Sequence, residues 1–392
     1  MESVKNGAKL SVILGAAFAM MTGWFGGGWA TGQFAVRYST QFGWYGLFLP
    51  VVGVGFICII AWIIVEWSRL NNTWNYGDFM GKFYGTPIIK VIFDVIQVIS
   101  LPISFAGCTA TFGSILQTYL GGNYIMWMML FNVIVLFSVI WGTEVVNRLA
   151  SVMGVLILAI LIIVFGTIIG NGYGSHVGEL VATKTVFTDT NPFYGSSIGL
   201  FMLTAGMALS ILPCFSGMET REDVTKTCLW SFLFCGVFIF IVSFNVLSFA
   251  PETLTENIPV LYIIQSMGAR WLVPLYVLIV CLAVVSTGNA MCNGYSRRFM
   301  NFKFLSGWKS SDMVKMIVIS VIILGISTIV SLMGITMIFQ VAYGYVAILN
   351  APLVSFGITV IGIVKMIQIK RCNISLERNS MENMGSWSMF KK

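Results

Sequence analysis

Apolar runs long enough to cross a lipid bilayer recur along almost the whole chain. A membrane-spanning α-helix needs about 20 mostly apolar residues. Ten segments fit this length: 10–36, 44–65, 88–118, 124–141, 149–169, 195–218, 228–249, 271–294, 313–333 and 336–366. Since 57% of the 392 residues are hydrophobic and only 9% are charged, a soluble domain of ordinary composition is excluded. We predict an all-α polytopic protein embedded in the lipid bilayer.

The basic residues divide unevenly between the two sides of these segments. If the N-terminus is cytoplasmic, only Arg37, Lys184 and Arg270 of the 22 Lys and Arg residues face outward. Basic residues in short cytoplasmic connections are the usual determinants of membrane topology, so we predict that both termini are cytoplasmic. The formal charge of +7 is spread over these connections, which argues against a nucleic-acid partner.

Residue types that carry enzyme chemistry are scarce. The eight cysteines show no CxxC spacing and are typical of small core residues, not of a disulfide or metal framework. The single histidine, His176, falls in a predicted outer loop. Because no buried cluster of His, Cys or carboxylate side chains is evident, we predict that the protein is not an enzyme and has no organic cofactor.

A glycine-rich stretch interrupts the first apolar run. Residues 23–32 read GWFGGGWATG, and each glycine inside a helix costs about 1 kcal/mol relative to alanine. We therefore predict that the first helix breaks here. Unwound backbone at bilayer depth is tolerated only where protein or a water-filled cavity surrounds it, so the break predicts a cavity. Interrupted helices of this kind hold substrate and ion in secondary transporters.

The longest outward loop separates five segments from five. An odd number of spans in each half gives the halves opposite orientations, as in an inverted repeat. We predict a first repeat over 1–170, an extracellular linker over 171–194, a second repeat over 195–368 and a cytoplasmic tail over 369–392. The sixth segment should then be interrupted at Ala205-Gly206. The alternative is that Gly206 only permits close helix packing and Pro213 only kinks the helix.

The glycine stretch resembles a motif of one transporter family. Residues 26–33 are similar to the GAGFASGQE motif of the YkvI-like bacterial membrane proteins, within the amino acid-polyamine-organocation superfamily. Phe34 stands where that motif ends in glutamate. Further similarities follow in the expected order: Glu66-Trp67, Phe105-Ala106-Gly107, Ser286-Thr287 and Tyr343-Gly344-Tyr345. The resemblance implies the LeuT fold, a five-plus-five inverted repeat with interrupted helices 1 and 6, in the bacterial inner membrane.

The resemblance also implies a sodium site. In LeuT-fold proteins one sodium ion lies between helix-one carbonyls and a Ser/Thr pair on helix eight, which here corresponds to Ser286 and Thr287. By spacing from the break, we predict Thr22 and Phe25 as the carbonyl donors. The alternative is that the hydroxyl pair only bonds its own helix backbone. Because no titratable side chain is expected near the midplane, sodium is favoured over protons as the coupling ion; a facilitator with no coupling ion stays open.

The predicted substrate is small and zwitterionic. Amides from Gly28 to Gly32 could hold a carboxylate, and carbonyls at the gap of segment six could hold an amino group. The predicted substrate residues are Gly26, Gly27, Gly28, Trp29, Thr31, Phe105, Ala205, Gly206 and Trp24.

The predicted function is therefore secondary transport with alternating access, importing an amino acid together with sodium. Two alternatives stay open. Trp24 and Trp29 could hold a quaternary amine by cation–π attraction, or the fold could serve as an uncoupled facilitator, channel or solute sensor.

Overall fold

The computed structural model describes residues 7–24, 27–141, 143–206, 209, 211–300 and 310–369, and within them every regular element is a helix. Six helices in this part of the chain are long and apolar enough to cross a membrane by length and composition. They are α4 (Leu49–Asn71), α6 (Pro87–Leu120), α12 (Arg221–Leu247), α14 (Leu272–Met300), α16 (Asp312–Ser331) and the C-terminal helix Ile335–Ile369.

The remaining predicted spans correspond to shorter or bent helices. Three are short apolar helices: α1 (Leu10–Trp24), α7 (Tyr124–Trp141) and α10 (Gly199–Thr204). The fourth is α8 (Thr143–Gly170), whose C-terminal end bends by 76° into α9 (Gly174–Thr183). The prediction of a polytopic all-α membrane protein is confirmed.

Both predicted interruptions are present. The first span is divided into α1, α2 (Gly27–Ala30) and α3 (Gln33–Tyr38), with Gly32 between the last two at φ +90°. In the sixth span, the π-helical turn η2 (Phe193–Ile198) leads into α10, which ends at Thr204, and the 3₁₀ turn η3 (Leu212–Phe215) follows. The glycines thus end helices where the sequence predicts.

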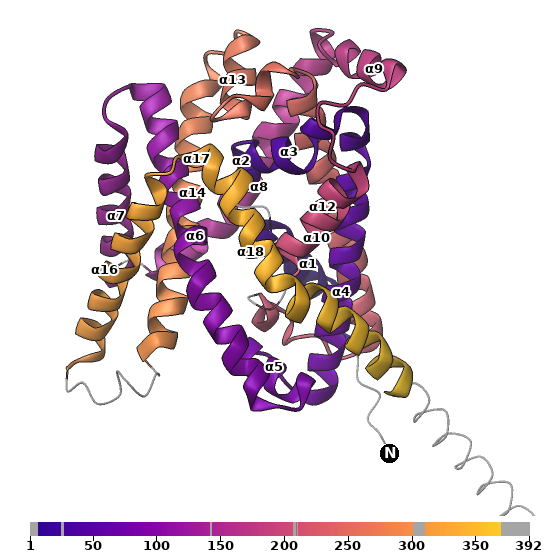
Figure 1. Cartoon of the computed structure of the whole chain (residues 1–392). Coiled ribbons are helices and arrows are strands. Elements are labelled where there is room, and N and C mark those ends of the chain that lie inside the picture. Colours follow the sequence, from indigo (N-terminus) through magenta and orange to yellow (C-terminus); the bar gives the residue numbers. More distant parts are fainter. Residues whose placement is uncertain are drawn as a thin grey trace, which may run out of the picture.

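The helices pack in two groups. In the first group, α1 and α4 lie on α12, and α10 lies on α4. In the second, α6 contacts α7, α14 and α16, and α14 also contacts α8. The tenth span lies against both groups and runs diagonally across the front of Figure 1. Its parts are α17 (Ile335–Met337), η5 (Ile338–Ala342), α18 (Tyr343–Asn350) and η6 (Ala351–Ile358).

Short helices mark the two ends of the molecule. The helices α9 and α13 (Pro259–Ser266) lie at the opposite end of the molecule from α5 (Tyr76–Tyr84) (Figure 1). The Tyr84 hydroxyl donates to the Leu353 carbonyl and the Lys365 ammonium donates to the Phe83 carbonyl. Burial raises the pKa of Tyr84 to about 12, so this hydroxyl stays a donor at physiological pH. These bonds tie α5 to the tenth span.

The 3₁₀ turn η1 (Thr40–Leu47) contains the tightest backbone approach, and it makes a stability prediction. Gly43 has φ +55°, and a Cβ placed on it would lie 1.8 Å from the Thr185 carbonyl oxygen. The amide of Trp44 donates to that same oxygen at 3.2 Å. Because backbone cannot move aside as a side chain can, Gly43→Ala should lower the free energy of unfolding by roughly 3 kcal/mol or more. Thermal unfolding of the purified protein in detergent measures this loss.

Gly85→Ala is the matched control for Gly43→Ala. Gly85 also has positive φ, +71°, but a Cβ there would meet nothing within 4 Å. Gly85→Ala should therefore lower the free energy of unfolding only by the cost of backbone strain, about 1–3 kcal/mol. An equal loss in both variants would show that the contact with Thr185 is unimportant.

Candidate functional site

A cavity lies at the break of the first span, between α2, α6, α14 and the tenth span. About 50 Å³ of it is open to water-sized molecules. A single water needs about 10–15 Å³ by the same measure, so the cavity has room for a few waters or for a solute of few heavy atoms. Its lining residues are Gly23, Gly27, Gly28, Phe34, Gly107, Cys108, Thr287, Met291, Phe339 and Tyr343.

Glycine is required at α2 because neighbouring side chains press directly on its backbone. A Cβ on Gly27 would lie 2.7 Å from a Val284 methyl group. A Cβ on Gly28 would lie 2.6 Å from the Phe34 ring and 2.7 Å from the Phe339 ring. Real Cβ atoms do not approach so closely, so these two glycines let bare backbone form one side of the cavity.

Hydrogen bonds hold α2 in this position. The Tyr276 hydroxyl on α14 donates to the Ala30 carbonyl at 2.9 Å, and the Val260 amide on α13 donates to the Thr31 carbonyl at 3.1 Å. The Thr31 hydroxyl itself donates to the Gly28 carbonyl at 3.2 Å. Thr31 is fully buried, so this predicted substrate residue lies behind the cavity lining and supports its backbone.

Three aromatic rings form another part of the cavity wall, beside Gly28. Phe34 meets Phe339 and Tyr343 edge to face, with ring centroids 4.9 Å and 5.2 Å away. Phe339 and Tyr343, one turn apart, stack at 5.3 Å. The Tyr343 hydroxyl donates to the Ser104 carbonyl at 3.2 Å. None of these three rings is among the substrate residues predicted from the sequence. The available signal was the pairing of Phe339 and Tyr343 at i and i+4 on one helix face.

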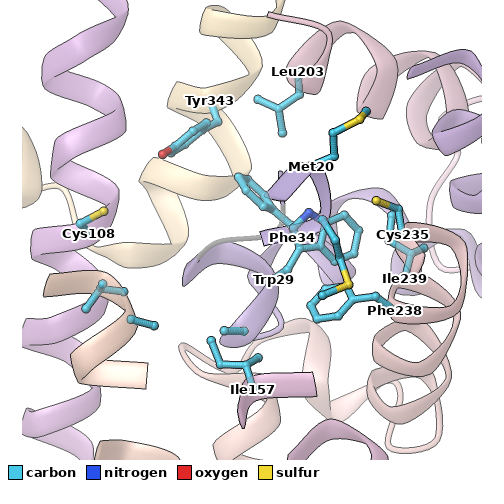
Figure 2. Close-up of a cluster of buried hydrophobic side chains, with 14 of the residues drawn as sticks. Met20, Trp29, Phe34, Cys108, Ile157, Leu203, Cys235, Phe238, Ile239 and Tyr343 are labelled. Carbon is cyan, nitrogen blue, oxygen red and sulfur yellow. The ribbon is translucent and has the colours of Figure 1, made fainter. Parts of the chain in front are cut away.

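Trp29, one of the two tryptophans predicted to contact the substrate, is not part of this wall. Trp29 is fully buried and belongs to a hydrophobic cluster that also contains Phe34, Ile157 and Phe238 (Figure 2). It is not part of the cavity lining. The side chain of Trp24 and the whole of Gly26 lie outside the described residues.

Three other predicted substrate residues also lie away from the lining. Phe105 is fully buried and packs on Phe131, with ring centroids 5.9 Å apart. Ala205 is fully buried. A Cβ on Gly206 would lie 3.7 Å from the Asn350 side-chain oxygen, so Gly206 faces the tenth span. Neither residue of the second break is among those that line the cavity.

One predicted sodium ligand, Thr287, lies near the break in the first helix. Thr287 lines the cavity together with Gly23 and Gly27 of the broken helix, and its hydroxyl donates to the Ala283 carbonyl at 3.0 Å. A hydroxyl that donates its proton in this way keeps lone pairs for a cation. Ser286, next to it on α14, is buried.

Of the two predicted carbonyl donors on the first helix, only Thr22 lies within the described residues. The Thr22 hydroxyl bonds back to the Phe18 and Ala19 carbonyls at 3.2 Å. The Thr22 carbonyl is one of the last four in α1, which have no amide partner within the helix. Phe25 lies outside the described residues. The sodium site therefore stays a prediction.

Next to the lining residue Phe34, the buried side-chain amide of Gln33 joins three parts of the fold. Gln33 is fully buried, and its side-chain amide donates to the carbonyls of Glu256 and Asn257 at 2.9 Å and 2.8 Å. The Gln340 amide donates to the Gln33 side-chain oxygen at 3.4 Å. These bonds join α3, the loop before α13 and the tenth span. Gly23, which lines the cavity, is exposed.

Among the residues that the structure describes, the cavity lining carries no charged side chain. Within the described ranges there is also no group of three or more His, Cys, Asp or Glu residues that could hold a metal ion. The chemistry on offer is that of bare backbone, one threonine hydroxyl, a thiol, a thioether and aromatic rings. Such a lining binds by dipoles and apolar contact.

Three solved structures with the same fold are similar to this chain over most of its length. An inward-facing conformation of Mhp1 superposes with a TM-score of 0.61 at 15% identity, covering 88% of this chain and 75% of that chain. A substrate-bound, outward-open Na+-coupled sialic acid symporter gives 0.52 at 13% identity, covering 87% and 85%. A mutant of the Eremococcus coleocola manganese transporter gives 0.52 at 10% identity, covering 87% and 76%.

No family model matches the sequence, and no curated protein matches it either. At identities of 10–15% the structural likeness shows the fold alone. It confirms the prediction of a LeuT-like fold with interrupted helices 1 and 6. Membership of the amino acid-polyamine-organocation superfamily, and the likeness to YkvI-like proteins, stay predictions.

Proposed function

We propose that this protein is a secondary transporter that imports a small zwitterionic solute, an amino acid, by sodium symport. The observation that carries the proposal is a small cavity at a broken helix, with an exposed glycine in its lining. Alternating access requires a site that opens to one side at a time, between helix groups that can move against each other. The two helix groups described above supply such a division.

The backbone around the break suits the charged ends of a zwitterion. The last carbonyls of α1, at Gly23 and before it, have no helical partner and carry partial negative charge. Gly27 and Gly28 expose backbone on the same cavity because no Cβ covers it. An ammonium group and a carboxylate can therefore both find backbone partners without any charged side chain.

The aromatic wall favours an amino acid over a quaternary amine. A cation is held well when it lies within about 6 Å of several ring faces. Here Phe34, Phe339 and Tyr343 contact one another at centroid distances of 4.9–5.3 Å, which leaves no gap for a cation between them. Trp29 is not part of the lining. The wall thus offers apolar surface but no aromatic cage.

The orientation of the proposed cycle follows from the predicted topology. With both termini cytoplasmic in a bacterial inner membrane, the Gln33 hydrogen bonds lie toward the extracellular side, where we propose that they seal the cavity, and Gly23 lies toward the cytoplasmic side. The structure then corresponds to an inward-facing state. In the same proposal, residues 1–170 and 195–368 are the two repeats, 171–194 links them outside the cell, and 369–392 is a cytoplasmic tail.

Uptake into proteoliposomes tests the proposal. Purified protein is reconstituted, and accumulation of a radiolabelled amino acid mixture is compared with and without an inward sodium gradient. We expect accumulation above equilibrium only with the gradient. Equal accumulation in both conditions would defeat the sodium coupling and leave a facilitator. Absence of uptake for every amino acid would defeat the proposed solute class.

Thr287→Ala tests the sodium site itself. It removes a hydroxyl oxygen from the cavity, and an interaction with a charged partner is worth about 1.5 kcal/mol or more, so half-saturating sodium should rise about tenfold. Thr287→Ser keeps the oxygen and should retain most of the sodium affinity. The matched control is Thr167→Ala on α8, where the hydroxyl donates in the same way to the Ile163 carbonyl but does not line the cavity. Sodium dependence that is unchanged in Thr287→Ala would remove this residue from the site.

A further inference from the structure

We propose that the cavity selects solutes whose side chain is small, apolar and uncharged, and that Gly107 and Phe339 set the size limit. This inference rests on the proposed function and adds to it which part of the solute the aromatic wall receives. The class it names is aliphatic amino acids from glycine to valine, with charged and bulky aromatic amino acids excluded.

The wall has little to offer a polar side chain. Phe34, Cys108, Met291, Phe339 and Tyr343 supply most of its side-chain surface. The Tyr343 hydroxyl already donates to the Ser104 carbonyl at 3.2 Å, so its proton is not available to a solute. A charged group placed here would lose its hydration without gaining a partner. An aliphatic group loses nothing polar and gains apolar contact.

Gly107 lines the cavity directly beside the Phe339 and Tyr343 rings. A Cβ on Gly107 would lie 3.0 Å from the Tyr343 hydroxyl oxygen and 3.3 Å from Phe339 Cζ. Contacts this short force the neighbouring atoms to shift by a few tenths of an ångström. Tyr343 is tethered by its bond to Ser104, so an added methyl group takes space from the cavity instead. The residue at 107 therefore controls how long an apolar side chain can be.

The two ends of the solute are separated by this arrangement. Gly23 and Gly27 bring bare backbone to the cavity, and the side chains nearest to Gly27 are Val284 and Thr111, whereas Gly107 faces Phe339 and Tyr343. A zwitterionic head at the backbone side leaves the solute's side chain pointing at the rings. With about 50 Å³ open to water-sized molecules, the head and a short aliphatic chain fill the cavity.

Competition binding to the purified full-length protein tests the inference independently of transport. Thermal shift in saturating sodium gives apparent affinities for glycine, alanine, valine, leucine, lysine, glutamate and glycine betaine. For the wild type we expect lysine and glutamate to bind at least tenfold more weakly than alanine. One methylene group in an apolar pocket changes affinity by about 10- to 200-fold. Gly107→Ala should therefore weaken the binding of valine about tenfold relative to the binding of glycine.

Phe339→Leu is the complementary variant. It enlarges the cavity, so the affinity for leucine should rise about tenfold relative to the affinity for alanine by the same reasoning. This measurement still tests the inference if Gly107→Ala does not fold. Gly166→Ala is the control, because a Cβ at this site in α8 meets nothing within 4 Å, and it should keep the wild-type ratios.

The outcomes separate the two levels of the proposal. Binding of several amino acids with valine:glycine and leucine:alanine ratios unchanged in both variants would overturn the inference while leaving the proposed function intact. Glycine betaine binding more tightly than every amino acid would also overturn it. If no amino acid binds or is taken up by the wild type, the proposed function fails first and the inference fails with it.

Discussion

Gly28→Ala is expected to abolish uptake while the protein still inserts and folds. The added methyl group would lie 2.6 Å from two atoms of the Phe34 ring and 2.7 Å from the Phe339 ring. These rings are held by each other and by Tyr343, so α2 must move away from the wall. Overpacking of this kind costs about 1–3 kcal/mol, which corresponds to about a 10- to 100-fold loss of affinity if it falls on the bound state.

Two variants decide whether the loss from Gly28→Ala comes from the clash. Gly15→Ala lies in α1 of the same span, where a Cβ meets nothing within 4 Å, and should keep uptake near the wild-type level. Adding Phe34→Ala to Gly28→Ala removes one of the two rings and should restore part of the solute binding. Uptake of Gly28→Ala at the wild-type rate would show that α2 tolerates displacement and does not form the site.

Gln33→Ala is expected to open the proposed seal at the extracellular end of the cavity. It removes the two hydrogen bonds to the carbonyls of Glu256 and Asn257, and each such bond contributes about 0.5–1.5 kcal/mol. That loss falls only on the closed state, because these carbonyls meet water once the seal opens. The population of the state open at this end should rise by about tenfold or more.

Cys108 provides the readout for the Gln33 variant. Cys108 lines the cavity and carries a free thiol, so a membrane-impermeant thiol reagent should label it faster from the α13 side in Gln33→Ala. Cys214, which is exposed, and Cys372 in the tail are first replaced by serine. Thr336→Val, which removes only the partly solvated bond to the Asn257 side chain at 2.9 Å, should give a smaller increase. Labelling that does not depend on residue 33 would show that the seal lies elsewhere.

The architecture could be predicted from the sequence because its signals are local. Ten apolar runs and one cluster of glycines determine the spans and the first break, and the odd number of spans per half predicts the position of the second. Each of these features depends on composition within a window of about 20 residues. None depends on how a helix is rotated about its own axis.

The lining of the cavity depends on that rotation, and the sequence does not specify it. Phe105 was predicted to line the site, yet it packs on Phe131, and Gly107 lines the cavity instead. Two positions on a helix differ by about 200°, so a small error in assumed orientation selects the opposite face. The same limitation explains why Trp29 was favoured and Phe34 was not.

The Gln33 hydrogen bonds could not be predicted for a different reason. Gln33 bonds to backbone carbonyls more than 220 positions away in the chain, and no side-chain pattern marks a carbonyl as a partner. A glutamine that follows a glycine motif is unremarkable in sequence. Its importance appears only when the loop before α13 is brought over α3 by the fold.

The uncharged lining has an electrical consequence. Under the proposed sodium symport, the conformational change with an empty cavity moves no net charge across the membrane. The conformational change with a loaded cavity moves the charge of the bound ion and solute. One sodium ion with one zwitterion amounts to a single positive charge per cycle. The membrane potential then acts on the loaded step alone, with about 2.3 kcal/mol per 100 mV, so a cell could concentrate the solute even where sodium inside and outside were equal.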